Sequence, residues 1–250
     1  MKTGYKLLAS LSVLIVCAWL MVRGPLPHLH HTFTVTQFAV NTACTATSQT
    51  CDVTVSSTGS GHVLAAGTVL NINDGGITAV SGGGTWALCP ASGCYQTDNN
   101  ARTTDLAYCL SSTSGATTIT VTRTTTTSAT WQAAVWELSF TGSSASLDTF
   151  GKRQQSTATT SPAGVTLTLT GSNDAIIQII RTGGTTPSAI SAPYNLHAGS
   201  GGAGWAESIN TVSGTAPTWT TGSGRAALSA IAFAEITSST TVPRGHGSIF

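Results

Sequence analysis

Glu137 is the acidic residue whose surroundings in the sequence most suggest chemistry. It lies in the alternating stretch 131–140 and shares a strand face with Ala133, Val135 and Ser139. A carboxylate on a strand could bind sugar hydroxyls or act as an acid, but glycoside hydrolysis needs two carboxylates about 5–10 Å apart. None of its neighbours on that face is acidic. We therefore expect Glu137 to bind a ligand or to hold a structural hydrogen bond rather than to catalyse.

Tyr194 and Trp205 are the aromatic residues best placed to stack on a sugar ring. They flank the Gly-rich stretch 199–204, and binding surfaces often form at such loops. The alternative is that both rings fill the core, because tryptophan is usually highly buried. The stretch 199–204 is not expected to hold phosphate, since no lysine follows it and no helix begins there.

Two segments rich in Asn and Asp supply oxygen ligands of the kind that calcium prefers. Residues 71–75 resemble the start of a calcium loop, but no glutamate follows at the twelfth position, and turn chemistry explains them equally well. Residues 98–100 with Asp105 form a weaker version of the same pattern. The histidines at 28–31 fit a linker better than a metal site. No Ser-His-Asp arrangement is evident, so we expect no catalytic residue, no metal and no cofactor.

Five cysteines follow the N-terminal apolar segment: Cys44, Cys51, Cys89, Cys94 and Cys109. The first two and the next two each bracket a short polar loop, which predicts two local disulfides in an oxidising compartment. A zinc site is the alternative, but the spacing fits it loosely and no histidine lies near in the sequence. Cys109 is left over and is expected to be a buried thiol, because residues 106–110 have a strand pattern.

The beginning of the chain has the pattern of an export segment. Lys2 and Lys6 precede an apolar stretch, residues 7–22, which Arg23 and two prolines follow. The stretch is longer than a signal-peptide core needs to be and shorter than the roughly 20 residues that span a bilayer, so both a cleaved signal and a retained anchor are open. Either one places the body outside the cytoplasm, with membrane contact only through residues 7–22.

Charge and composition exclude several classes of protein. Charged residues make up 8% of the chain and hydrophobic residues 40%, so the sequence is neither disordered nor strongly charged. Outside the N-terminal segment, seven basic groups face nine acidic ones. No basic surface for nucleic acid is expected.

Threonine and aliphatic residues alternate along much of the body, as at 118–122 and 165–170. This period of two predicts strands with one face in the core and one in water, hence an antiparallel two-sheet β-sandwich, jelly-roll-like, preceded by one N-terminal hydrophobic helix. A β-bulge near 36–37 would bring the two halves of 33–40 into phase. Other strands are expected at 53–55, 63–72, 106–110, 131–140, 147–150, 175–181, 206–212 and 226–236. The predicted parts are a signal peptide or anchor (1–24), a linker (25–31), the sandwich (32–236) and a flexible tail (237–250).

Several motifs carry a family resemblance through their order in the chain: Gly61-His62-Val63-Leu64, Gly84-Thr85-Trp86, Leu106-Ala107-Tyr108, 114–121, 135–142, 173–177, and 216–219 with 232–233. Between residues 61 and 236 the chain resembles a class of secreted bacterial β-sandwich domains of the jelly-roll or concanavalin-like kind. The resemblance implies a part in exported surface or adhesive proteins and supplies no catalytic residues. The Cys89–Cys94 loop departs from the pattern.

Three functions follow from these observations. The leading expectation is a non-enzymatic secreted or cell-surface β-sandwich that binds carbohydrate or a surface protein. A self-assembling structural subunit, filament or virion-like, is the alternative, since jelly rolls build capsids. A glycoside hydrolase or lyase on a concanavalin-like scaffold would need distant acids to converge. The acids considered for it are Asp52, Asp98, Asp105, Glu137, Asp148 and Glu207.

Overall fold

The structure is a computed structural model that describes residues 32–72, 75–98, 101–124 and 130–236. The predicted N-terminal helix and signal segment, the linker and the C-terminal tail lie outside the described residues. Strands dominate what is described, where the one helix is a short 3-10 turn, η1 (Pro90–Ser92). None of the described helical structure is long and apolar enough to cross a membrane. The prediction of an all-β protein is confirmed.

The described strands form four sheets, and every pairing in them is antiparallel. The six-stranded sheet runs in the order β1 (Phe33–Cys44), β9 (Trp131–Phe140), β3 (Val63–Leu70), β7 (Thr103–Cys109) and β5 (Ala87–Leu88), with β6 (Gln96–Thr97) also paired to β7. The five-stranded sheet runs in the order β10 (Ser144–Thr159), β16 (Gly224–Ile236), β11 (Asp174–Thr182), β14 (Ala203–Thr211) and β13 (Asn195–Ala198).

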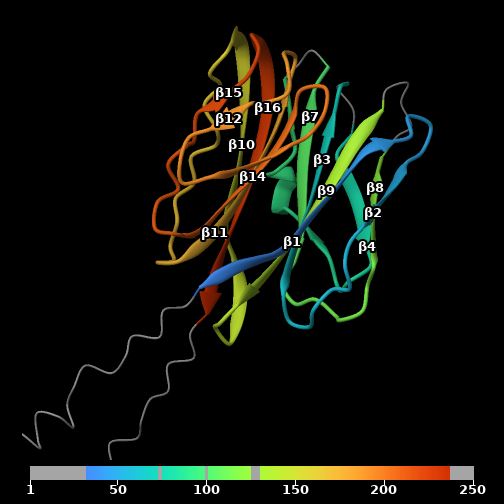
Figure 1. Cartoon of the computed structure of the whole chain (residues 1–250), viewed down its shortest axis with the longest axis vertical. Helices are drawn as coiled ribbons and strands as arrows, with labels where there is room; N and C mark the ends of the chain where they lie inside the picture. Colours follow the sequence, from blue (N-terminus) through green and yellow to red (C-terminus); the bar gives the residue numbers. More distant parts are fainter. Residues whose placement is uncertain (1–31, 73–74, 99–100, 125–129, 237–250) are drawn as a thin grey trace, which may run out of the picture. The chain divides into compact units, whose positions relative to one another are not determined.

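Two small sheets complete the fold. The three-stranded sheet runs in the order β2 (Thr50–Thr54), β8 (Thr118–Arg123) and β4 (Ile77–Ser81). The two-stranded sheet pairs β12 (Ala189–Ile190) with β15 (Trp219–Thr220). Figure 1 shows the five-stranded, six-stranded and three-stranded sheets side by side in that order.

Other layers of the protein cover both faces of the six-stranded sheet, because its strands carry apolar side chains on both faces. In β3, Val63 belongs to the core shared with the five-stranded sheet, and the next residue, Leu64, belongs to the core shared with the three-stranded sheet. In β9 likewise, Trp136 belongs to the core shared with the five-stranded sheet and Val135 to the core shared with the three-stranded sheet. Successive side chains of a strand point to opposite faces, so these continuous apolar runs fill two cores at once.

The five-stranded sheet is also buried on both faces. Ile177 in β11 faces the six-stranded sheet, whereas Ile176 belongs to a third core with Leu228 and Trp219. All residues of β11 are buried. The described body therefore contains three hydrophobic cores between its layers, and a simple two-sheet sandwich with one wet face on each sheet is not confirmed.

The predicted strand at 165–170 is wrong in one respect and correct in another. Val165 and Leu167 are buried while Thr166 and Thr168 are exposed, as the alternation predicts, but the segment joins no strand ladder. It lies instead against the third core, with the Leu167 N–H donating to the Gly214 carbonyl at 2.8 Å. Alternation of apolar and polar residues indicates an extended segment with one buried face. It does not indicate which other segment pairs with its backbone.

Two finer predictions are confirmed. The pairing of β1 with β9 shifts register between Val35 and Gln37, where the alternation required a bulge. Residues 226–236, predicted as a strand, lie within β16, which pairs with β10 and β11 in the five-stranded sheet.

Candidate functional site

The two aromatic residues expected to bind a sugar lie inside the protein. Trp205 is fully buried and packs edge-on against Trp136, with 6.1 Å between the ring centroids. Tyr194 is 8% exposed, and its hydroxyl accepts a hydrogen bond from the Gln178 side-chain amide at 3.1 Å. Burial raises the pKa of the Tyr194 phenol. The expected exposed platform is therefore not formed, and the alternative, core filling, describes both rings.

Glu137 lies at the centre of a buried hydrogen-bond network. Its side chain is 1% exposed and accepts hydrogen bonds from the Gln37 side-chain amide and from the Gly59 N–H at 2.6 Å. Nδ1 of His62 lies 2.6 Å from the same carboxylate. Burial acts to raise the pKa of Glu137, but the hydrogen bonds from these three groups and the charge that His62 can carry outweigh it, so the pKa is lowered. Glu137 is an ionised structural residue with its donors in place.

A second Glu–His pair lies on the opposite face of β9. The carboxylate of Glu207, in β14, accepts a hydrogen bond from the Trp136 indole N–H at 3.0 Å and lies 2.7 Å from Nε2 of His197. Phe38 stacks on the His197 ring, with 4.0 Å between the centroids. The pair thus ties the six-stranded sheet to the five-stranded sheet at the rim of their common core.

These pairs could in principle assist proton transfer, because a carboxylate-held imidazole is the usual partner of a nucleophile. Within the described residues, neither the His62 nor the His197 imidazole is hydrogen-bonded to a serine, threonine or cysteine side chain. Each pair links neighbouring parts of a sheet: His62 directly precedes β3 and contacts Glu137 in β9, and His197 and Glu207 lie in the paired strands β13 and β14.

The remaining acids are mostly held by nearby donors. Asp98 pairs with Arg102 at 2.5 Å, and the exposed Asp52 accepts the Thr120 hydroxyl at 2.6 Å. Asp105 is 8% exposed and accepts the N–H groups of Ile77 and Leu106, each at 2.8 Å. Burial raises the pKa of Asp105 to about 6, although both backbone donors and Lys152 act to lower it.

One pair of acids does face each other. Asp174, at the start of β11, is fully buried next to the Asp148 carboxylate of β10. The two carboxyl groups approach each other directly, without the space for a sugar that glycosidases leave between theirs. Because Asp174 is inaccessible to a substrate, the pair does not form a hydrolase site.

A surface pocket of about 350 Å³ opens beside the edge strand β5, lined by Thr85, Ala87, Tyr108, Leu110 and Ser111. Thr85, Ala87 and Ser111 are exposed, and Tyr108 is half-buried against Phe233, with 6.2 Å between the ring centroids. The pocket therefore offers an aromatic side chain, two hydroxyls and no charged group. Such a lining suits an uncharged ligand that carries both apolar and hydroxyl surface.

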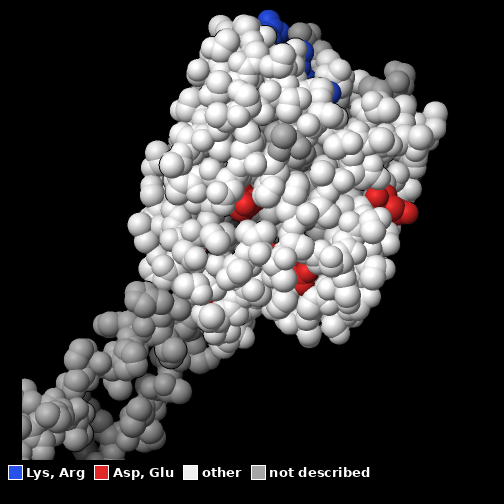
Figure 2. Space-filling model, in the orientation of Figure 1, with Lys and Arg blue, Asp and Glu red and all other residues white. Residues whose placement is uncertain are grey.

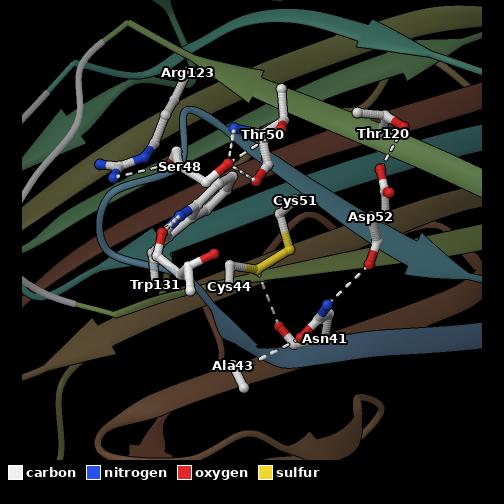
Figure 3. Close-up of a disulfide and its surroundings, with 11 residues drawn as sticks. Asn41, Ala43, Cys44, Ser48, Thr50, Cys51, Asp52, Thr120, Arg123 and Trp131 are labelled. Carbon is white, nitrogen blue, oxygen red and sulfur yellow. Dashed lines mark hydrogen bonds between the residues drawn. A yellow bond between two sulfur atoms is a disulfide. The ribbon is translucent and has the colours of Figure 1, made fainter.

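The disulfide between Cys44 and Cys51 closes a loop that the surrounding residues hold firmly (Figure 3). The loop carbonyls of Thr45 and Ala46 accept the Trp131 indole N–H and an Arg123 N–H, each at 3.2 Å. The guanidinium of Arg123 lies 4.9 Å from the centroid of the Trp131 ring, in the range of a cation–π contact. This end of the three-stranded sheet is thus fixed both covalently and by side chains.

The disulfide between Cys89 and Cys94 fastens a different kind of loop. Cys94 is fully buried, and its carbonyl accepts the hydroxyl of Ser229 in β16. The loop between β5 and β6 therefore connects the six-stranded sheet with the five-stranded sheet. Both disulfides match the predicted pairs, and they are typical of proteins that mature in an oxidising environment outside the cytoplasm. Cys109 is the free, buried thiol that was expected, and burial raises its pKa.

The calcium candidates of the sequence are not assembled into a site among the described residues. Residues 73–74 and 99–100 and the histidines at 28–31 lie outside them. Asp98 is neutralised by Arg102, and Asp105 is used by two backbone donors. In the described parts of the chain, no group of three or more His, Cys, Asp or Glu side chains could hold a metal ion.

Sequence reasoning missed His62, His197 and the pair of Asp148 with Asp174. The residues of each pair come from different strands or loops, so no local pattern joins them. Asp148 lies at a bulge of β10 between Leu147 and Thr149, and no local feature of the sequence marks that bulge. No family model matches this chain, and neither a curated protein nor a solved structure shows significant similarity to it.

Proposed function

We propose that the protein is a non-enzymatic, secreted or cell-surface β-sandwich that binds an uncharged carbohydrate in the pocket beside Tyr108. The observation that carries this proposal is the lining of that pocket, which combines an aromatic ring with the hydroxyls of Thr85 and Ser111. Aromatic faces stack on the apolar faces of sugar rings, and hydroxyls fix their orientation. The aromatic residue with this role is then Tyr108 rather than Tyr194 or Trp205.

The sparse charge of the surface supports a neutral ligand. In the view of Figure 2, most of the described surface carries no charge, and the acidic and basic groups lie at separate places. Such a surface attracts neither nucleic acid nor a strongly charged partner through long-range forces. Recognition would then depend on the shape and hydroxyl groups of the ligand.

The fold and localisation belong to the same proposal. We assign the six-stranded and five-stranded sheets as the two layers of a jelly-roll-like sandwich, to which the two small sheets add outer layers. The two disulfides favour an extracytoplasmic protein, either released or anchored through residues 7–22. A class of secreted bacterial β-sandwich domains fits both features.

A glycan array followed by calorimetry on the responding glycan tests this function. We expect binding by the native protein, loss of binding in Tyr108→Ala, and retention in Val212→Ala, which alters an exposed side chain elsewhere. Because Tyr108 packs on Phe233, its removal could weaken the fold. Ala87→Phe fills the pocket from an exposed edge position and should abolish binding while leaving the Tm unchanged. Binding that survives in Ala87→Phe would refute the assignment to this pocket.

A structural subunit is the second candidate, and one observation favours it. The strand β10 spans Ser144–Thr159 and forms an edge of the five-stranded sheet, where its outer backbone groups could pair with another chain. Lys152 and Arg153 on this strand act against such pairing by like-charge repulsion. Light scattering over a range of concentrations distinguishes the two functions: growth of assemblies without glycan binding would favour the subunit. The hydrolase alternative has no specific observation in its favour.

A further inference from the structure

Asp174, at the start of β11, is a fully buried carboxylate. Neither of its oxygens makes a hydrogen bond of acceptable geometry to another described residue. Its polar neighbours are the Asp148 carboxylate and the Gly171 backbone N–H. Buried polar atoms without partners are rare in folded proteins, and they commonly mark a place where a bound water or ion belongs.

The place of Asp148 in the sheet orients its side chain toward Asp174. It occupies the bulge of β10 between Leu147 and Thr149, and bulges redirect side chains. The Thr170 N–H donates to Asp148 Oδ2 at 2.9 Å, and the Thr170 hydroxyl donates to Oδ1. Asp148 is partly exposed, so solvent reaches one side of the pair. The arrangement orients Asp148 toward Asp174 and leaves access from outside.

No basic side chain balances the two acids. Within the described part of the chain, neither Asp148 nor Asp174 forms an ion pair with lysine, arginine or histidine. Two adjacent carboxylates without a counter-charge repel each other strongly at low solvent exposure. A cation or a shared proton must relieve that repulsion.

Gly171 leaves the space that this carboxylate needs. A Cβ added at Gly171 would lie 1.8 Å from Asp174 Oδ1, so any other residue would displace the carboxylate. The 171–174 turn thus folds its backbone closely around the acid. Main-chain oxygens of a turn are common ligands for hard cations.

We propose that Asp148 and Asp174, together with the 170–173 backbone and water, form a calcium site that joins β10 to β11. A proton shared between the two acids would satisfy only one oxygen of Asp174, whereas a cation can contact both. Calcium accepts irregular sets of six to eight oxygens that include water, whereas magnesium demands a regular octahedron. With two carboxylates, the affinity should lie in the range of extracellular calcium modules, a Kd of about 0.1–1 mM.

The pKa of Asp174 agrees with this geometry. Burial and the neighbouring Asp148 raise it to about 7, and the Gly171 N–H offsets part of the effect.

Calorimetry with CaCl2 on the full protein, stripped with EDTA and dialysed at pH 7.5, tests the proposal. We expect one calcium per chain and a rise in Tm of about 2–6 °C at saturation. Asp174→Asn and Asp148→Asn should each lose the binding heat and the shift in Tm, and Asp52→Asn, which changes an exposed acid, should keep both.

Three results would overturn it: no heat up to about 10 mM calcium, binding that persists in both variants, or an equal rise in Tm from NaCl at matched ionic strength. The first of these would assign the pair to a shared proton. Because Asp148→Asn could disturb Thr170, Gly171→Ala supplies an independent variant, which should also lose calcium binding. Glycan binding at the Tyr108 pocket is measured separately and should be unaffected by Asp174→Asn.

Discussion

Glu137 and Asp174 are both buried carboxylates, 1% and 0% exposed, yet their surroundings shift their pKa values in opposite directions. Glu137 accepts hydrogen bonds from Gln37, Gly59 and His62, and its pKa is lowered. Among the described residues, Asp174 has no hydrogen bond of good geometry and faces a second acid, and its pKa is raised to about 7. Burial alone therefore does not decide the charge of an acid, because the donors around it do.

Asp105 lies between these extremes. It is nearly as buried as Glu137 and accepts two backbone hydrogen bonds, but no side chain of the described residues donates to it, and its pKa is raised to about 6. The three acids form a series in which the pKa falls as donors are added. An acid with its full set of donors is structural, and an acid without them is the place to look for a ligand.

The largest effect should come from removing the fully satisfied acid. Glu137→Ala removes the carboxylate that accepts hydrogen bonds from Gly59, Gln37 and His62, and we expect a loss of about 3–5 kcal/mol in the free energy of unfolding. Urea unfolding measures it. Asp52→Ala, at an exposed acid bonded to Thr120, should cost less than about 1 kcal/mol. Equal losses in the two variants would show that the donors around Glu137 do not matter.

The pH dependence of stability should follow the acids with raised pKa values. Between about pH 4 and 6, folded Asp105 keeps a proton that the unfolded chain releases, so its contribution to stability is lost as the pH rises through that window. Folded Asp174, whose pKa is raised to about 7, extends the fall in stability to about pH 7. Asp105 alone should contribute about 2–3 kcal/mol to this fall. Glu137 has the opposite sign: its contribution is present above its unfolded pKa and is lost as the pH falls below it.

Urea unfolding at pH 4 and at pH 6.5 measures the fall in the native protein and in Asp105→Asn. The variant should show a smaller difference between the two pH values, whereas Asp52→Asn should show the native one. Stability that rises between pH 4 and 6.5 by the same amount in all three proteins would contradict the assignment for Asp105.

Much of the fold could be predicted from local patterns. The alternation in 118–122 and the bulge at 36–37 follow from period-two burial, which the backbone geometry imposes locally. The strand at 226–236 was also predicted, although residues 226–234 are buried on both faces. The layering could not be predicted in the same way. A strand such as β3, apolar on both faces, shows that two layers cover it but not which ones. The prediction of a paired strand at 165–170 was wrong for the same reason, because tertiary packing decides which part of the backbone this segment contacts.

The candidate sites were harder to predict because they depend on contacts between distant residues. The two disulfides were found since each joins cysteines 7 or 5 residues apart, within one loop. Asp174 and Asp148 meet through a bulge and a turn that have no signature at either residue. Trp205 was misplaced because a tryptophan beside a glycine-rich loop has the same sequence pattern whether it faces solvent or the core.

Neutralising the unsatisfied acid should have the reverse effect of removing Glu137. In EDTA at pH 7.5, Asp174→Asn removes the repulsion with Asp148 and the burial of a charge, and we expect a gain of about 1–2 kcal/mol in the free energy of unfolding. Urea unfolding of both proteins in the same buffer measures it. A loss of more than about 1 kcal/mol would mean that the carboxylate is stabilised by the fold as it stands.

The smallest effect should come from removing one donor to Glu137. His62 is 25% exposed, so water can replace its ring in His62→Ala, and we expect a loss of about 0.5–1 kcal/mol. Gln37→Ala should cost more, because the Gln37 amide also bonds the backbone N–H of Ser56 at 2.7 Å. If urea unfolding shows that His62→Ala costs as much as Glu137→Ala, then one ion pair rather than the set of donors keeps Glu137 charged. The contrast with Asp174 would then depend on a single partner.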